Sequence, residues 1–226
     1  MEKLLAGLHK FQDEGFRDHQ ELFGKLEHGQ APDALFITCS DSRINPNLLT
    51  QTNPGELFIL RNAGNIIPPY SLGSGEAATI EFAVAKLKVK DIIICGHSHC
   101  GAVNGIMHPE IVEELPALRA WLHNSQAVHY LVAKNYPEVA KDDARTINVA
   151  IQENVLLQIE NLKTHPSVQA GVAAGTLKLH AWVYKFETGQ VFSYEPKAEQ
   201  FLALVAPDAS KERRKARFVT TGAETI

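Results

Sequence analysis

The sequence predicts an α/β fold whose central β-sheet is mostly parallel and flanked by helices. Apolar runs of strand length lie at 34–38, 56–61 and 91–95, and a helical pattern at 74–88 leads into the third of them. Strand, helix and strand in this order imply a parallel crossover. Because the ends of parallel strands meet at one edge of a sheet, the residues that follow the first and third runs should face one crevice.

Residues 1–28 carry apolar side chains at roughly helical spacing, interrupted by Gly15. This periodicity predicts two amphipathic helices. Such a pair must bury its apolar face on its own core or on a neighbouring subunit, and the periodicity alone favours neither.

The second half of the chain favours helices followed by a hairpin. Helical patterns lie at 115–123, 125–136 and 143–163. Alternating apolar residues, many of them β-branched or aromatic, then predict strands at 177–186 and 191–194, joined by a turn at 187–189.

Composition excludes several classes of function. The 226 residues are 45% hydrophobic, which is enough to bury one core. A net charge of -4 argues against a nucleic-acid partner, and the one basic cluster, 211–217, is typical of a solvated tail. Three cysteines are too few for a disulfide framework, which favours a reducing compartment. With no signal peptide and no membrane-length apolar run, we expect a cytoplasmic protein without a membrane partner.

Two short motifs carry candidate metal ligands. Cys-Ser-Asp-Ser-Arg occupies 39–43 after the first strand, and His-Ser-His-Cys occupies 97–100 after the third. Two thiolates and one imidazole would fill three of the four tetrahedral positions of zinc. Water or the nearby carboxylate of Asp41 is left for the fourth.

The spacing of the first motif poses a choice for Asp41. In an extended loop, Cys39, Asp41 and Arg43 point to the same side. Asp41 can then bind the metal, or it can accept hydrogen bonds from Arg43 and leave the position that catalysis requires open. The plainer alternative is an ordinary turn with a surface ion pair.

The second motif offers more ligands than one site needs. Cys95 belongs to the apolar run and is interpreted as a core residue. His97 and Cys100 have the two-residue gap that is typical of compact zinc sites, whereas His99 and Cys100 are adjacent. Geometry therefore favours His97, although His99 is harder to exclude than Cys95.

Three segments resemble the β-class carbonic anhydrases. These are Cys-Ser-Asp-Ser-Arg at 39–43, Pro-Gly-Glu-x-Phe-x-x-Arg-Asn at 54–62 and Gly-His-Ser-x-Cys-Gly at 96–101. The resemblance runs in register from about residue 30 to 107 and continues more weakly to 179–184. It looks most similar to cyanobacterial, carboxysome-associated members, but their long C-terminal extension is absent, so a cytoplasmic location is expected.

The resemblance implies a zinc lyase that hydrates carbon dioxide reversibly to bicarbonate and a proton, by attack of zinc-bound hydroxide. One Zn²⁺ per subunit would be bound by Cys39, His97 and Cys100. Asp41 and Arg43 would form the catalytic gating pair, with Asp41 a fourth ligand only in an inactive state.

The same resemblance implies the residues that bind substrate, namely Gln30, Phe58, Ala63, Phe82 and Gly101. Gln30 would act from across a dimer interface, and Phe58 would form an aromatic wall of the carbon dioxide pocket. Ala63 stands where valine is usual, and Phe82 stands where plant enzymes carry tyrosine.

The resemblance also implies a domain plan and an assembly. Residues 1–28 would be an arm of helices extending onto a dimer partner, 29–202 a zinc-containing α/β catalytic domain, and 203–226 a C-terminal tail. The homodimer would assemble into a tetramer or octamer.

One branch of the family is inhibited by bicarbonate at a second site built from a tryptophan, an arginine and a tyrosine. Arg61 and Tyr184 match that site, but Phe36 stands at the tryptophan position and lacks an indole N–H donor. We therefore predict that this second site is absent or weak, and that Asp41 is paired with Arg43 in the resting enzyme.

Two alternatives remain beside this interpretation. A hydrolase of carbon disulfide or carbonyl sulfide would use the same zinc chemistry on a linear analogue. A structural zinc module, closed permanently by Asp41, is disfavoured because such a site rarely needs an adjacent arginine to compete for a ligand.

Overall fold

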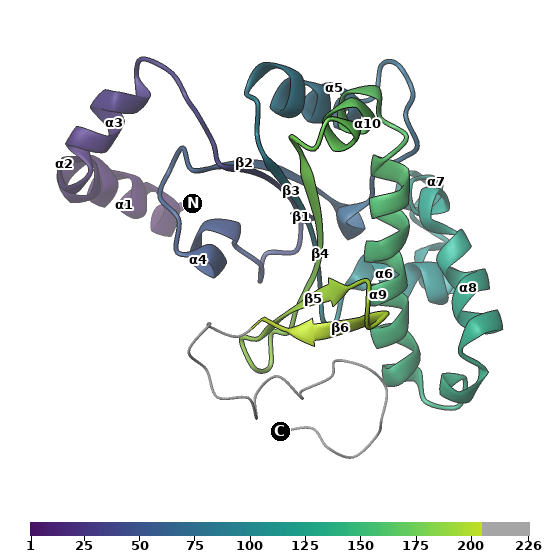
Figure 1. Ribbon diagram of the computed structural model, residues 1–226. Helices are drawn as coiled ribbons and strands as arrows, with labels where there is room; N and C mark the ends of the chain where they lie inside the picture. The colour runs from purple at the N-terminus through teal and green to yellow at the C-terminus, as the bar shows by residue number, and fades with distance from the viewer. Residues whose placement is uncertain (205–226) are drawn as a thin grey trace.

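The computed structural model describes residues 1–204, and the basic cluster at 211–217 lies outside them. A six-stranded sheet with strand order β2-β1-β3-β4-β5-β6 forms the centre (Figure 1). Its strands are β1 Ala34–Cys39, β2 Leu57–Asn62, β3 Asp91–His97, β4 Lys178–Tyr184, β5 Val191–Glu195 and β6 Gln200–Ala203. The first four strands pair in parallel and the last two join antiparallel, so the predicted α/β fold is confirmed.

The central strands are buried because their sequences are apolar almost throughout. All six residues of β1 are buried, as are the last six of β3. Continuous apolar runs of this kind are typical of parallel strands covered on both faces. Thr38 of β1 pairs with Cys95 of β3, so the two strands end side by side at the same edge of the sheet.

Helices cover the sheet between these strands. They include α5 Gly75–Glu81, α6 Gly101–Met107, α7 Pro116–Leu122, α8 Ala127–Asn135, α9 Asp143–Leu162 and α10 Pro166–Ala173, with the short α4 Pro46–Thr50 after β1. The helical patterns predicted at 74–88, 115–123, 125–136 and 143–163 each contain a helix. Helices α4, α6 and α10 and strand β6, each of eight residues or fewer, were not predicted because they are too short to show a clear periodicity. The short α5 and α7 were predicted because each continues into a further helical turn, at Phe82–Lys86 and His123–Ser125.

The N-terminal segment differs from the prediction in where it bends. It comprises α1 Glu2–Lys10, a π-helical turn at Phe11–Gly15, α2 Phe16–Asp18 and α3 Gln20–Leu26. The break lies at His19 (φ -115°, ψ 16°), so the predicted interruption at Gly15 was wrong. A Cβ on Gly15 would lie 3.1 Å from the Phe11 ring, so the glycine gives that ring room within a continuous helix.

These N-terminal helices extend away from the sheet (Figure 1), and none of their residues is buried within the chain. Their exposed large apolar side chains are Leu4, Leu5, Leu8, Phe11 and Phe16. Within residues 1–204, no helix combines the length and apolar character that a bilayer span requires.

Helix α9 packs directly on β3 and β4, and Gly96 of β3 permits the close approach. A Cβ at Gly96 would lie 2.7 Å from Val155 Cγ2 and 3.4 Å from Ile151 Cγ2. Val155 and Ile151 are themselves buried, so neither side chain has free space to move into. The contact fixes β3 against the helix one residue before His97.

Substitution of Gly96 by alanine should destabilise the protein, because the added methyl group overlaps Val155. We expect the free energy of unfolding to fall by about 1–3 kcal/mol, measured by urea denaturation. Gly75→Ala is the matched control, since nothing lies within 4 Å of a Cβ at that position. Equal stability of the two variants would contradict the packing argument.

Candidate metal centre

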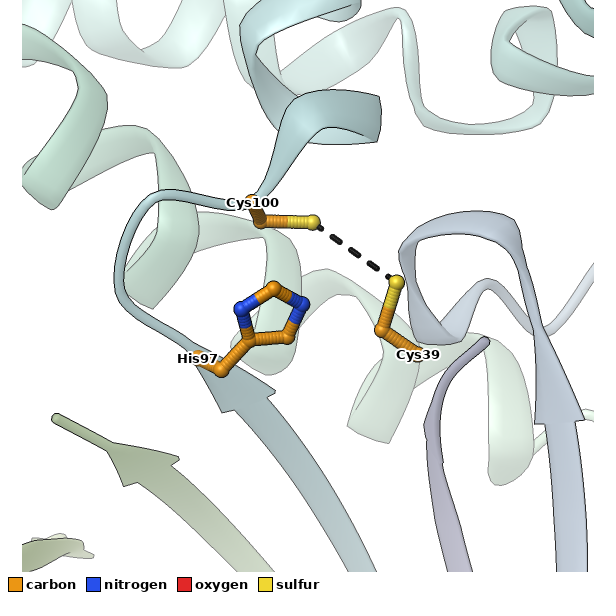
Figure 2. A group of neighbouring side chains, drawn as sticks. All are labelled: Cys39, His97 and Cys100. Atoms are coloured by element: carbon orange, nitrogen blue, oxygen red, sulfur yellow. Dashed lines mark hydrogen bonds between the residues drawn. The ribbon is translucent and has the colours of Figure 1, made fainter. Parts of the chain in front are cut away.

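Two cysteines and one histidine converge at the edge where β1 and β3 end (Figure 2). Cys39 is the last residue of β1, His97 is the last of β3, and Cys100 caps the N-terminus of α6. The ligand atoms of the three lie within 4.8 Å of one another. The two sulfur atoms are 4.0 Å apart, and all three residues are buried.

The His97 ring fits a metal ligand by its hydrogen bonding. Nδ1 lies 2.8 Å from the carbonyl oxygen of Ser98, an acceptor, so Nδ1 carries the proton. Nε2 is then left with a lone pair, and it is buried without a hydrogen-bond partner. An unpaired buried acceptor costs about 1–3 kcal/mol. Two thiols and a free imidazole nitrogen form a donor set suited to zinc.

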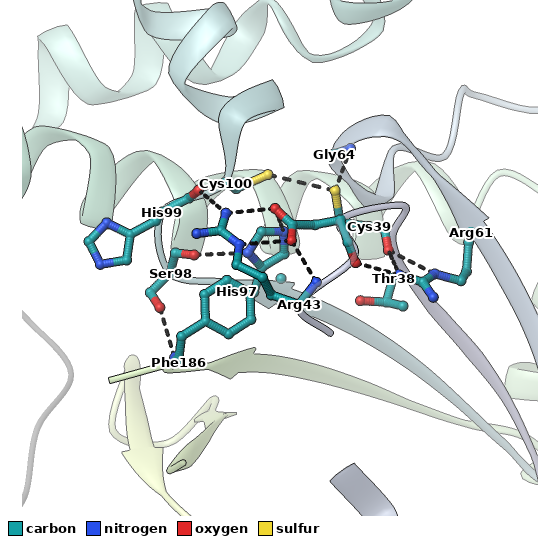
Figure 3. A network of polar contacts seen from close by, with 12 residues as sticks. Thr38, Cys39, Arg43, Arg61, Gly64, His97, Ser98, His99, Cys100 and Phe186 are labelled. Carbon is teal, nitrogen blue, oxygen red and sulfur yellow. Dashed lines mark hydrogen bonds and ion pairs between the residues drawn. The ribbon is translucent and has the colours of Figure 1, made fainter. Parts of the chain in front are cut away.

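The side chains of Cys39 and Cys100 share a hydrogen bond, so their pKa values shift in opposite directions. A hydrogen bond from the Cys100 thiol is the main cause that lowers the pKa of Cys39 to about 4, against the opposing effect of burial. The backbone N–H of Gly64 donates to the same sulfur at 3.3 Å (Figure 3). The pKa of Cys100 is raised, because its thiol proton is held by Cys39 and because it is buried. Cys39 is therefore the thiolate of the pair.

Asp41 and Arg43 form a bidentate ion pair beside this group. Arg43 Nε donates to Asp41 Oδ1 at 2.9 Å, and Arg43 Nη2 donates to Oδ2 at 2.7 Å. These bonds hold the pKa of Asp41 well below its usual range, although burial opposes them. Asp41 Oδ2 lies 4.0 Å from His97 Nε2, so the carboxylate is next to the ligand group while both of its oxygens are bound to arginine.

Arg61 of β2 supports the loop that carries Cys39 and Asp41. Its guanidinium donates twice to the carbonyl of Cys39, at 3.0 and 2.9 Å, and once to the carbonyl of Asp41, at 2.6 Å (Figure 3). The sequence resemblance assigned Arg61 only to a second bicarbonate site, so this contact was missed.

Three amide side chains of α9 support the backbone at 64–67, beside the ligand group, and were also not predicted from the sequence. Asn154 donates to the carbonyl of Gly64 at 2.9 Å, and Asn161 donates to the carbonyl of Ile67 at 2.8 Å. Gln158 accepts from the Ile67 N–H at 2.8 Å. Amides spaced by four and three residues on the buried face of a helical pattern were the signal in the sequence.

The structure separates the remaining candidate ligands from the group. His99 Nε2 lies 2.6 Å from Glu187 Oε1, and the side chain of His99 is 64% exposed. Cys95 is fully buried in the apolar core, and burial raises its pKa. His97 is thus the histidine that lies with the two cysteines.

The residues expected to bind substrate lie in several places. Phe58 of β2 and Phe82 have neighbouring rings, with centroids 5.9 Å apart. The carbonyl of Ala63 accepts from Trp121 Nε1 at 2.8 Å, and Gly101 is the first residue of α6. Gln30 lies exposed between α3 and β1.

Comparison with known proteins agrees with this arrangement. The family model described as carbonic anhydrase matches residues 34–191. A carbonic anhydrase from Synechocystis is 45% identical over 205 residues, covering 90% of this chain and 74% of that protein.

Solved structures agree as well. The β-carbonic anhydrase CcaA has a TM-score of 0.87 and 44% identity, over 92% of this chain and 93% of that one. A tetrameric β-carbonic anhydrase from Sordaria macrospora has a TM-score of 0.75 and 30% identity, over 85% and 95%. The alternative of a carbon disulfide or carbonyl sulfide hydrolase finds no support in these comparisons. The chain belongs to the β-class carbonic anhydrase family and is an enzyme of that activity.

Proposed function

We propose that this carbonic anhydrase depends on one Zn²⁺ per subunit, bound by Cys39, His97 and Cys100, and that it hydrates carbon dioxide reversibly to bicarbonate and a proton. The observation that carries the proposal is the buried His97 Nε2, which has no hydrogen-bond partner and shares one group with two cysteine sulfurs. When bound, zinc lowers the pKa of a water molecule and so supplies a nucleophile near neutral pH.

Asp41 and Arg43 are proposed to act as the catalytic gate of this site. An ionised carboxylate only accepts hydrogen bonds, so Asp41 orients the attacking water through that water's proton. Arg43 occupies both oxygens of Asp41 and holds them 4.0 Å or more from His97 Nε2. In this proposal Asp41 becomes a fourth ligand only in an inactive state.

We assign substrate binding to Gln30, Phe58, Ala63, Phe82 and Gly101. The adjacent rings of Phe58 and Phe82, of which Phe82 is 44% exposed, support an apolar surface for a nonpolar gas. The backbone of Gly101 and the amide of Gln30 would orient substrate or bicarbonate. In this proposal Gln30, which is exposed on its own chain, would act in the site of a partner subunit.

A weak or absent inhibitory bicarbonate site stays a prediction. Phe36 is buried and packs edge-on against Trp182, with ring centroids 6.2 Å apart, and its ring has no donor for an anion. The guanidinium of Arg61 is already engaged by the carbonyls of Cys39 and Asp41.

Removal of zinc should abolish the activity, and one equivalent of zinc per subunit should restore it. In the zinc-loaded enzyme, the rate of carbon dioxide hydration should rise with pH. The nucleophile is a deprotonated water, and the thiolates of Cys39 and Cys100 offset the positive charge that acidifies it. Asp41 is not the source of this rise, because Arg43 keeps its pKa low and the carboxylate stays ionised.

Metal analysis combined with stopped-flow hydration across pH tests both statements. A flat rate from acid to alkaline pH, or full activity without metal, would refute this account of the site.

Arg43→Ala should suppress turnover by roughly 10- to 100-fold, the range for loss of a group that supports a metal site. Without the guanidinium, Asp41 Oδ2 is released and could bind the metal, while the backbone N–H of residue 43 still donates to Oδ1 at 2.9 Å. Hydration rates are compared with those of Ser42→Ala, which changes the neighbouring exposed residue. Wild-type turnover in Arg43→Ala would exclude the gating role.

The N-terminal helices are proposed to pack on a second copy of the chain. Their large apolar side chains are exposed, with Leu5 at 49% and Leu8 at 50%. The tetrameric relative from Sordaria macrospora supports a homodimer that assembles further. A partner would give these amphipathic helices the burial that their own chain does not provide.

Leu5→Glu combined with Leu8→Glu should dissociate the assembly. Each buried leucine contributes about 1.5–3 kcal/mol, so the pair accounts for about 3 kcal/mol or more. The mass is measured by sedimentation, with Lys3→Glu as a control that makes the same change in net charge. An unchanged mass in the double variant would show that this face is not the interface.

A further inference from the structure

The turn that joins His97 to Cys100 is attached to the β4–β5 hairpin by the backbone, through the Ser98 N–H and the Tyr184 carbonyl at 2.9 Å, and by the carboxylate of Glu187. Ser98 Oγ donates to Glu187 Oε2 at 2.8 Å, and His99 Nε2 lies 2.6 Å from Glu187 Oε1. The N–H of Phe186 donates in turn to Ser98 Oγ at 2.9 Å (Figure 3). Both residues between the two ligands are therefore tied to the hairpin.

The conformation of this turn explains why it needs such an attachment. His99 has a φ of 55°, in the left-handed region that residues other than glycine rarely adopt. A residue held in that region persists only where its surroundings fix it. This residue immediately precedes Cys100, so the direction of the second sulfur depends on it.

The two attachments differ in strength. The pair of His99 and Glu187 is 64% and 43% exposed, and exposed ion pairs contribute little. Ser98 is fully buried, so its hydroxyl requires both of its hydrogen bonds. The hydrogen bond from Ser98 is therefore the main link between Glu187 and the turn. The hydrogen bond with His99 is a second, weaker link.

The link continues to the histidine ligand itself. His97 Nδ1 donates to the carbonyl of Ser98 at 2.8 Å, so the orientation of the ring follows the position of Ser98. A carboxylate that fixes Ser98 thereby fixes the direction of the Nε2 lone pair. Burial raises the pKa of Glu187, but hydrogen bonds from its own backbone, Ser98 and His99 outweigh that effect and lower it, so the group is an ionised acceptor.

We propose that Glu187 is a positioning residue for the metal site: it locks the turn at 98–99 so that His97 Nε2 and Cys100 Sγ face one point before metal arrives. The side-chain hydrogen bonds of Glu187 go to Ser98 and His99, which lie between the ligands. The proposal rests on the proposed metal site and adds to it a residue from a different part of the fold.

Three variants test this role. Glu187→Ala removes both hydrogen bonds. Glu187→Gln keeps an oxygen to accept from Ser98 but turns an N–H toward His99 Nε2, which now donates to the carboxylate. Thr188→Ala removes only the hydroxyl of the neighbouring turn residue, which accepts from the Gln190 N–H at 3.4 Å. Zinc Kd is measured by competition with a chelator, and the absorption spectrum of the Co²⁺-substituted protein reports the geometry at the two sulfurs.

Glu187→Ala should raise the zinc Kd roughly tenfold, the lower end of the range for groups that support metal ligands. Its Co²⁺ spectrum should also shift in the sulfur charge-transfer region. Glu187→Gln should restore most of the affinity and the spectrum, and Thr188→Ala should match wild type. Urea denaturation of the metal-free variants separates a loss of folding from a loss of positioning.

An unchanged Kd and spectrum in Glu187→Ala would overturn the positioning role. So would a Kd in Glu187→Gln as high as that of Glu187→Ala, because the amide oxygen still accepts from Ser98 Oγ, the main link to the turn. A wild-type protein that binds no zinc would instead refute the proposed function, so the two failures are distinguishable.

Discussion

The parallel pairing of β1 with β3 is the constraint on which the rest of the site depends. It places Cys39 and His97 at the ends of adjacent strands, at one edge of the sheet. Both strands are buried and continuously apolar, so a slip in register would expose apolar side chains and separate the ligands. Helix α9 is fixed to the same strands, because it packs against β3 at Gly96, the residue before His97.

Hydrogen bonds from three different elements then hold the loops around the ligand group. Arg61 of β2 binds the backbone of the first loop, Asn154 of α9 binds the loop of Gly64, and Glu187 of the hairpin binds the turn before Cys100. Without a metal, the arrangement carries the cost of the buried His97 Nε2, which has no hydrogen-bond partner. The surrounding hydrogen bonds offset that cost, because they fix the backbone that carries the donors.

The sequence predicted the ligand group better than it predicted what supports it. Apolar runs followed by Cys39 and His97 are local signals, and parallel topology brings their ends together without further information. The partners of these loops are distant in sequence: Asn154 reaches Gly64 across 90 residues, and Glu187 reaches Ser98 across 89. Hydrogen bonds between residues so far apart leave no periodic pattern in the sequence, so only the folded structure identifies them. The bend at His19 was not predicted for a different reason. Gly15 seemed to break the helix, but it lies in a π-helical turn that continues into α2, and the bend follows after α2.

Arg43 links the two loops that meet at the site, which determines how the proposed gate works. Besides its two bonds to Asp41, its Nη2 donates to the carbonyl of His99 at 3.1 Å, and its guanidinium lies 4.6 Å from the centroid of the Phe186 ring. The arginine side chain is 52% exposed whereas that of Asp41 is 16% exposed. The arginine is therefore held in place by its hydrogen bonds and its contact with the Phe186 ring more than by burial. A guanidinium fixed on the second loop and on the hairpin stays in place when the carboxylate departs. In the proposed gate, opening and closing would therefore be a movement of Asp41 alone.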